Sequence, residues 1–289
     1  MTAFLPLQGF LRGRPAILRH GPVAVILIED DAAVPETLRH HLRLGFRHLL
    51  ALSAQPVDIP PDLAAQVTNV AWDRRQPGAC HDAVNAIIRA VPQGTWLYVG
   101  FNAEFLFFPF SETRSVGELL AFHAEERRDA MLCYVIDLYA PDLTTAPNGV
   151  SLPDAMFDRT GYFALGRKGR DGAPLDRELD FHGGLRWRFE EHVPPARRRI
   201  NRIALFRTAR GLRMDADHRF SVQEYNTHSC PWHHNLTAAI ASFRAAKALA
   251  TNPGSRDAIG TFRWGNSLRF EWRSQQLMDL GLMEPGQWF

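Results

Sequence analysis

The sequence predicts an α/β protein with a mainly parallel, open sheet flanked by helices. Short apolar runs such as 23–28 and 48–53 have no alternating polar positions, which is typical of strands buried on both faces. Segments of helical periodicity separate these runs, and strands that alternate with helices favour a parallel sheet. The chain has 289 residues, of which 46% are hydrophobic and 22% charged, so it is large enough to bury such a sheet.

The expected elements of the first hundred residues alternate regularly. Strands are expected at 23–28, 48–53, 67–72 and 95–101. Helices are expected from residue 34 to the glycine at 45 and over 80–91. Asp31 is a candidate cap for the first helix, Pro35 lies near its start, and Gly45 is expected to end it.

The rest of the chain is predicted to add fewer regular elements. These are a helix over 115–128, strands at 131–139 and 203–206, and a helix over 236–249. Residues 141–180 are rich in Gly, Pro, Asp and Arg and are interpreted as a long excursion over one end of the sheet, a kind of segment that is often functional. The predicted organisation is an N-terminal segment 1–22, a domain 23–235 and a C-terminal helical extension 236–289.

Composition limits the function classes and the compartment. The formal net charge of +2 argues against bulk electrostatic capture of nucleic acid. Three distant cysteines fit a reducing compartment rather than a disulfide framework. Residues 1–21 lack the continuous apolar core of a signal peptide, and no run of about 18 apolar residues predicts a transmembrane helix. A cytoplasmic protein is therefore expected.

Polar side chains follow several of the predicted strands. They are Glu29, Asp30, Asp73, Asn102 and Glu104. Because parallel strands place their carboxyl ends at one edge of a sheet, where open α/β sheets bind ligands, we expect the four carboxylates to converge on one cleft. The alternatives are a helix cap for Glu29 and Asp30 and solvated turns for Asp73 and Glu104.

Converging carboxylates would need a positive charge nearby. A pair of like charges at ~4 Å costs a few kcal/mol at a near-surface dielectric. We expect arginine to supply this charge, from Arg74, Arg75, Arg186 or Arg188. Arg186 and Arg188 follow a Gly-Gly pair and are expected to alternate on a strand that either binds a diphosphate or lies at the surface.

Two further groups of residues are candidates for chemistry. Asp137 lies inside an apolar strand, so it is either a site carboxylate or a paired structural one. Glu190 and Glu191 are candidates for a general base or an exposed acidic pair. A cluster of N and S donors further along allows a zinc site, and with it a hydrolase, or a single histidine acting in another site. Its members are His228, Cys230, His233 and His234.

The order of these segments resembles family-2-type glycosyltransferases of the GT-A fold. The matching segments are 25–46, with Glu29-Asp30 where a bacterial branch of the family has Asn-Glu, 101–106 (Phe-Asn-Ala-Glu-Phe-Leu), 136–139, 183–188, 202–207, His218 and 231–235. The resemblance covers roughly residues 23–245 and implies a GT-A-like domain of bacterial polysaccharide synthesis. It implies a nucleotide sugar donor and a glycan or other small acceptor, and it leaves peripheral membrane association open.

The resemblance also distributes roles over the candidate residues. Donor binding is implied for Glu29, Asp30, Asp73, Asn102, Glu104, Arg186, Arg188, His218 and His233. Catalytic roles are implied for Asp137, Glu190 and Glu191.

One departure from the family concerns the metal. The family carries Asp-x-Asp-Glu-Phe-Leu at this segment, and both aspartates are replaced here, by Phe101 and Ala103. Mg²⁺ or Mn²⁺ needs oxygen ligands, which these side chains lack. No metal ligand is therefore assigned, and three interpretations stay open: residual use of Mg²⁺ or Mn²⁺, arginine in place of the metal, or an inactive GT-A-fold protein that binds a sugar or a partner.

Overall fold

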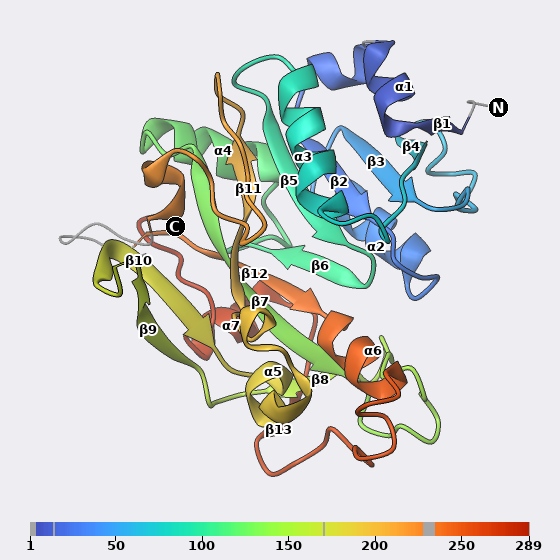
Figure 1. Cartoon of the computed structure of the whole chain (residues 1–289), viewed down its shortest axis with the longest axis vertical. Helices are drawn as coiled ribbons and strands as arrows, with labels where there is room; N and C mark the ends of the chain where they lie inside the picture. The colour runs from blue at the N-terminus through green and yellow to red at the C-terminus, as the bar shows by residue number, and fades with distance from the viewer. Residues whose placement is uncertain (1–3, 14, 170, 228–234, 289) are drawn as a thin grey trace. The chain divides into compact units, whose positions relative to one another are not determined.

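The computed structural model describes residues 4–13, 15–169, 171–227 and 235–288 (Figure 1). The chain forms two compact units. The first comprises Met1–Ala103, Thr113–Leu132 and Ile203–Asn226. The second comprises Glu104–Glu112, Cys133–Arg202 and Thr227–Phe289. Each unit has its own sheet arrangement and is described in turn.

The first unit contains the parallel sheet that the sequence predicts. Its strand order is β1-β4-β3-β2-β5-β11. The strands are β1 (Leu5–Pro6), β2 (Val23–Leu27), β3 (His48–Ser53), β4 (Val67–Ala71), β5 (Trp96–Phe101) and β11 (Asn201–Arg207). The first two residues of β11, Asn201 and Arg202, belong to the second unit. Neighbouring strands from β1 to β5 pair in parallel, and β11 pairs antiparallel with β5. Strands β2 and β3 are completely buried, as their unbroken apolar runs predict.

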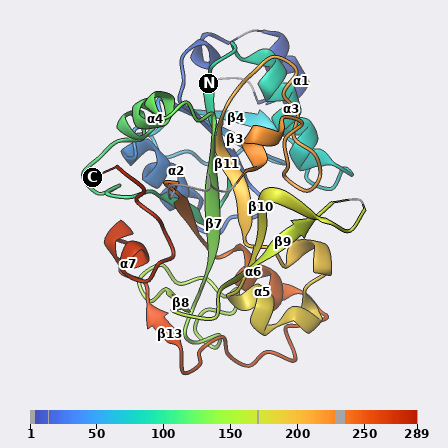
Figure 2. The ribbon, with the colours of Figure 1, turned by 90° about the vertical axis from the view of Figure 1, so that its left-hand side faces the viewer.

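Helices lie on both sides of this sheet. They are α1 (Leu7–Arg12), α2 (Val34–Arg43), α3 (Ala79–Ala90) and α4 (Val116–Glu125), with short 3₁₀ turns at Ala16–Arg19 and Gln223–Asn226. His41 of α2 stacks on Tyr98, and His123 of α4 contacts Trp96. Because Trp96 and Tyr98 are two residues apart on β5, α2 and α4 share one face. Figure 2 shows α1 and α3 on the other side.

The predicted cap of α2 is wrong, whereas α4 has a full capping box. The residue before α2 is Ala33, in a left-handed conformation with φ 50°, and no side chain caps the helix. Asp31 therefore does not act as its cap. At α4, Ser115 accepts from the backbone N–H of Glu118, and the Glu118 carboxylate accepts from the backbone N–H of Ser115.

The second unit is built around three sheet strands. They are β6 (Glu104–Phe107), β7 (Ala130–Tyr139) and β12 (Ala238–Ser242). Strand β12 pairs in parallel with β7 and antiparallel with β6. β8 (Met156–Asp158) pairs with the end of β7 and with β13 (Ser267–Arg269), and β9 (Phe163–Lys168) forms a hairpin with β10 (Pro174–His182). The predicted excursion 141–180 thus carries strands of its own.

Short helices complete the second unit. They are α5 (Leu185–Arg188), α6 (Arg244–Thr251) and α7 (Ser274–Asp279), with 3₁₀ turns at Glu190–His192 and Pro195–Arg197. The strand expected for Arg186 and Arg188 is therefore wrong, because these residues lie on α5. The helix expected over 236–249 is also wrong in its first half, where β12 is fully buried in the sheet. Residues 236–289 consequently do not form a purely helical extension.

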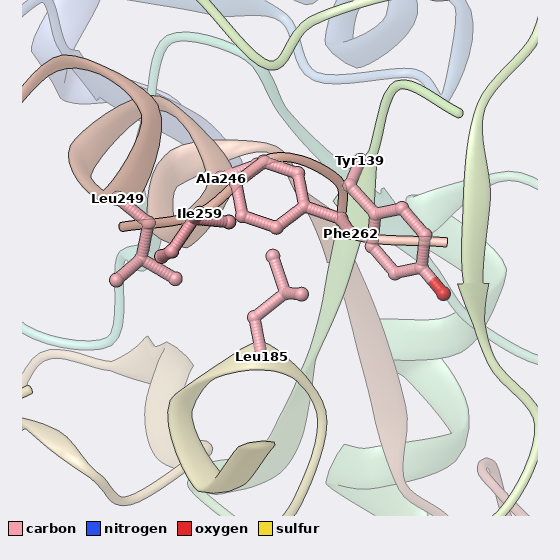
Figure 3. Close-up of a cluster of buried hydrophobic side chains, with 6 residues drawn as sticks. All are labelled: Tyr139, Leu185, Ala246, Leu249, Ile259 and Phe262. Atoms are coloured by element: carbon pink, nitrogen blue, oxygen red, sulfur yellow. The ribbon is translucent and has the colours of Figure 1, made fainter. Parts of the chain in front are cut away.

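An apolar cluster fixes α5 against the rest of the second unit (Figure 3). The side chain of Leu185 points from α5 towards Phe262 and the α6 residues, and it is fully buried. The cluster consists of Tyr139, Leu185, Ala246, Leu249, Ile259 and Phe262. Burying a leucine side chain contributes about 1.5–3 kcal/mol, so a helix of one turn can hold its place here.

Candidate functional site

Three polar side chains lie side by side on adjacent strands of the second unit. Ser242 of β12 is in register with Asp137 of β7 and with Glu104 of β6. Residues in register on neighbouring strands project to the same face of a sheet. All three are buried. We call Glu104, Ser242 and Asp137 the polar row.

Glu104 is held by an arginine and by the serine of the row. Arg202 forms an ion pair with it through both guanidinium Nη atoms, and its Nη1 lies 3.4 Å from Oε1. The hydroxyl of Ser242 donates to Oε1 at 3.0 Å. The carboxylate is 0% and the arginine side chain 10% exposed, so this is a buried ion pair. The expected arginine partner is present, but it is Arg202 rather than one of the four arginines predicted.

Asp137 is held by α5. The backbone N–H of Arg186 donates to Oδ2 at 3.3 Å, and Arg186 Nε lies 3.3 Å from Oδ1. Oδ1 nevertheless accepts no hydrogen bond from the described residues. Burial raises the pKa of Asp137 to about 6, against the lowering effect of Arg186, and the charges of Asp158 and Glu104 add to the rise. The pKa of Asp137 therefore lies above the usual range of a carboxyl group.

A glycine allows the close approach of α5 to Asp137. Gly184 precedes the helix with φ 63° and ψ −152°. A Cβ at this position would lie 3.1 Å from Oδ2 of Asp137. Both the backbone conformation and the space favour glycine here.

Asp158 is the centre of a second buried network, next to the polar row in the same unit. It accepts hydrogen bonds from the Tyr139 hydroxyl at 2.6 Å, Trp264 Nε1 at 2.7 Å and Arg188 Nη1 at 2.9 Å. Arg188 also donates to the carbonyl of Phe262 at 2.6 Å. The guanidinium of Arg188 is thus engaged within the protein, and its contact with a donor stays a prediction.

In the first unit, Asn102 organises the loop after β2. Its Oδ1 accepts from the backbone N–H of Glu29 at 2.9 Å. Its Nδ2 donates to the carboxylate of Asp30 at 2.7 Å and to the carbonyls of Asp30 and Ala32, each at 3.0 Å. The ends of β2 and β5 therefore bring Glu29, Asp30 and Asn102 together, as parallel neighbours should.

Asp73 has a different environment from the other strand-end carboxylates. It is hydrogen bonded to the side chain and backbone N–H of Arg75, two residues away, at 2.9 and 3.0 Å. This side-chain hydrogen bond, with the backbone one, lowers the pKa of Asp73 to about 2. Its observed contacts are those of a solvated turn residue, the alternative interpretation of the sequence.

The remaining predicted residues are exposed, lie in a turn, or fall outside the described residues. The side chains of Glu190 and Glu191 are 56% and 63% exposed and pair with Arg198 and His192. His218 lies in a turn with φ 57°. His233 belongs to the segment 228–234, which lies outside the described residues, as do His228, Cys230 and His234. The zinc hypothesis therefore stays a prediction.

The described residues contain no group of three or more His, Cys, Asp or Glu side chains that could hold a metal ion. Phe101 and Ala103 are both buried and offer no oxygen ligand. Over the same part of the chain, every helix is too short or too polar to cross a membrane.

Sequence reasoning missed two members of the site. Ser242 fell in a segment interpreted as helix, so its place beside the two carboxylates was hidden. Arg202 lay in a segment that matched the family, but no polar periodicity singled it out. In comparisons with known proteins, no family model matches this chain, and no characterised protein sequence matches it significantly.

Proposed function

We propose that the protein transfers a sugar from a nucleotide-activated donor to an acceptor hydroxyl, with Asp137 as the catalytic base. The observation that carries this proposal is the buried Asp137 on the polar row, whose pKa is raised to about 6. General bases work best when their pKa lies near the operating pH. The order of sequence segments, which resembles the family-2-type glycosyltransferases, supplies the reaction class.

In this reaction Asp137 takes the proton of the acceptor hydroxyl while the hydroxyl oxygen attacks the anomeric carbon of the donor. The new C–O bond forms while the bond to the diphosphate breaks, and the nucleoside diphosphate leaves with the electron pair. Arg186 holds the carboxylate of Asp137 in place through its backbone N–H and its guanidinium. Such positioning keeps the base ready for the hydroxyl.

The first unit has, by itself, a strand edge suited to binding a nucleotide. Its parallel strands end at the loop that Asn102 organises, and ligands of open α/β sheets bind at such carboxyl ends. Glu29 is half-buried and Asp30 exposed there, and both carboxylates suit the hydroxyls of a ribose. In the family, a metal ion lies at the Asp-x-Asp motif. In this chain Arg202 already pairs with Glu104, directly after that motif, so we propose that arginine supplies the positive charge in place of the metal.

The test combines binding and turnover. Thermal shifts with a panel of nucleotide sugars, with Mn²⁺ or with EDTA, should find a donor that stabilises the protein equally in both conditions. Asp137→Asn should bind that donor and lose transfer by ~10²–10⁴-fold. Absence of a shift from every donor at millimolar concentration would contradict the proposal, and donor binding lost on adding EDTA would contradict its metal-independent form.

A non-catalytic sugar- or partner-binding protein is the second candidate. It is favoured by the engagement of both carboxylates of the polar row by arginines that are 10% and 14% exposed. Measurable turnover by the unmodified protein would exclude it. If it is correct, donor binding persists in Asp137→Asn and no preparation shows transfer.

A further inference from the structure

Large apolar side chains are exposed around the hairpin and α5. Phe163 is 41%, Leu165 55% and Trp187 43% exposed. Figures 1 and 2 both show the β9–β10 hairpin beside α5. Exposed aromatic groups gathered in one place mark binding surfaces more often than single exposed residues do.

The rings form a corner. Phe163 and His182 are partners across the hairpin and stack with centroids 5.3 Å apart and planes 19° apart. Trp187 stands at 77° to Phe163, with centroids 6.2 Å apart. We call Phe163, His182 and Trp187 the aromatic corner. Leu165, two residues along β9 on the same face as Phe163, extends it.

Backbone features hold the tryptophan in this position. Gly161, with φ 94°, lies under the indole, and a Cβ there would be 3.3 Å from Cζ3. On α5, Leu185 is buried in the apolar cluster, while Arg186 and Arg188 reach Asp137 and Asp158. Trp187 is the exposed residue between these two arginines. The corner is therefore attached directly to the element that positions Asp137.

We propose that the aromatic corner is a carbohydrate-binding subsite that takes the acceptor of the proposed transfer. The C–H face of a sugar ring stacks on an indole or phenyl face, and its hydroxyls find hydrogen-bonding groups beside the rings. His182 supplies a ring nitrogen in the corner, and the ion-paired Asp180 and Arg199 lie close by on β10 and after α5. The assignment of the bound sugar as the acceptor rests on the proposed function. The stacking site itself follows from the geometry of the three rings.

The size and shape of the corner favour a sugar over other occupants. A stable protein interface buries about 800 Å² on each partner, far more than three rings and a leucine present. Phe163 and Trp187 are nearly perpendicular, so they form a corner that fits one sugar ring better than a flat surface. Burial lowers the pKa of His182, which favours the neutral form of its imidazole. An acidic bilayer surface would favour a cationic group there.

The test uses the full chain and an immobilised panel of gluco-, galacto- and manno-oligosaccharides, followed by calorimetric titration of the best binder. Trp187→Ala should weaken that binding at least tenfold, and Trp187→Phe should retain most of it. Leu5→Ala is the matched control, because Leu5 is exposed to a similar degree, 44%, in the first unit. Unfolding midpoints of all variants check that each is folded.

Each outcome decides the proposal. Oligosaccharide binding that Trp187→Ala weakens and Leu5→Ala does not supports it. Absence of binding to the whole panel, or equal binding by Trp187→Ala, overturns it. Binding only to phosphatidylcholine–phosphatidylglycerol vesicles, or self-association that Trp187→Ala abolishes, also overturns it. A nucleotide-sugar thermal shift in the same preparations tests the proposed function separately: its absence with intact oligosaccharide binding refutes the transfer and leaves the carbohydrate site.

Discussion

Glu104 and Arg202 bury opposite charges beside the hydroxyl of Ser242. Removing a charged side chain from water costs several kcal/mol. The attraction between two buried opposite charges offsets this desolvation cost only when their geometry is good and further hydrogen bonds are present. Here both Nη atoms of the arginine and the Ser242 hydroxyl face the carboxylate. Both oxygens of the Glu104 carboxylate thus have partners, and each member of the ion pair depends on the other.

We therefore expect Arg202→Met to destabilise the protein by about 3–5 kcal/mol, because it leaves Glu104 as an uncompensated buried charge. The double variant Glu104→Leu, Arg202→Met should recover most of this loss, since it removes both charges. Denaturant unfolding of the wild type, the single and the double variant measures the difference. A double variant no more stable than Arg202→Met would show that packing around the arginine, not its charge, carries the effect.

The raised pKa of Asp137 predicts a pH dependence of stability. The folded protein holds this proton up to about pH 6, whereas the unfolded chain releases it near 3.8. Between these values the folded state binds more protons, so the free energy of unfolding decreases as pH rises. The stabilising contribution of Asp137 is fully present below pH 3.8. The difference between the two pKa values corresponds to about 3 kcal/mol, which is lost by pH 7.

Asp137→Asn has no titrating group and serves as the reference. The difference in unfolding free energy between wild type and Asp137→Asn should shift in favour of the wild type as pH falls from 7 to 4. Urea unfolding at half-unit steps of pH measures it, and the other carboxyl groups cancel in the difference. A constant difference over this range would show that Asp137 is ionised throughout.

At the scale of elements, the approach of α5 to the polar row depends on Gly184. Its φ of 63° disfavours any side chain, and a Cβ would press on Asp137 at 3.1 Å. Gly281 has a similar φ of 67° with no atom within 4 Å of the added Cβ. Both glycines thus have a positive φ, and they differ in the contact that an added Cβ would make. Gly184 also has a ψ of −152°, a conformation that is essentially restricted to glycine.

Gly281→Ala should cost about 1 kcal/mol, from the left-handed conformation alone. Gly184→Ala should cost about 1–3 kcal/mol more, the range for overpacking in a core, and should weaken transfer by moving Asp137 or Arg186. Chemical unfolding and a transfer assay on both variants provide the comparison. Equal costs at the two positions would mean that the second unit adjusts freely around α5.

The sequence predicted well those elements whose hydrophobic pattern lies within the segment itself. The unbroken apolar run of β3 gave its bounds correctly, and the amphipathic pattern of α3 was displaced by only one residue at each end. β12 was misread because Ala-Ala-Ile-Ala-Ser favours helix by intrinsic propensity. Its strand conformation comes from pairing with β7 and β6, which are more than 90 residues away in sequence. Such tertiary pairing overrides propensity and leaves no local trace.

The same limit applies to the candidate site. Asp137 stood out in the sequence because a charge inside an apolar strand needs a partner. Its partner, Arg186, was expected near the strand-end carboxylates instead. The polar row itself could not be foreseen, because it depends on the register of three strands from distant parts of the chain. The solvated turn of Asp73, by contrast, was one of the two alternatives for this residue, and its partner Arg75 was among the arginines expected.

At the scale of the whole molecule, neither unit is one continuous segment of the chain. The second unit draws β6, β7 and β12 from three separated stretches. Its edge contacts also come from the far end of the chain, where Trp288 packs near Phe108 and the backbone N–H of Thr237 donates to the carbonyl of Glu284 at 2.9 Å. The boundary predicted at residue 235 therefore does not separate a domain from an appendage.

This organisation predicts that removing residues 236–289 abolishes the second unit rather than trimming it. The deletion takes away β12, which is completely buried, and leaves β6 and β7 with unpaired backbone groups and Glu104 without Ser242. The shortened chain should bind a hydrophobic dye strongly and exchange the amides of 133–202 rapidly in hydrogen exchange. Trp288→Ala, by contrast, should keep a cooperative transition and lose about 3–5 kcal/mol at most, as for an aromatic truncated in a core. Slow exchange of 133–202 in the shortened chain would instead show that this stretch folds without β12.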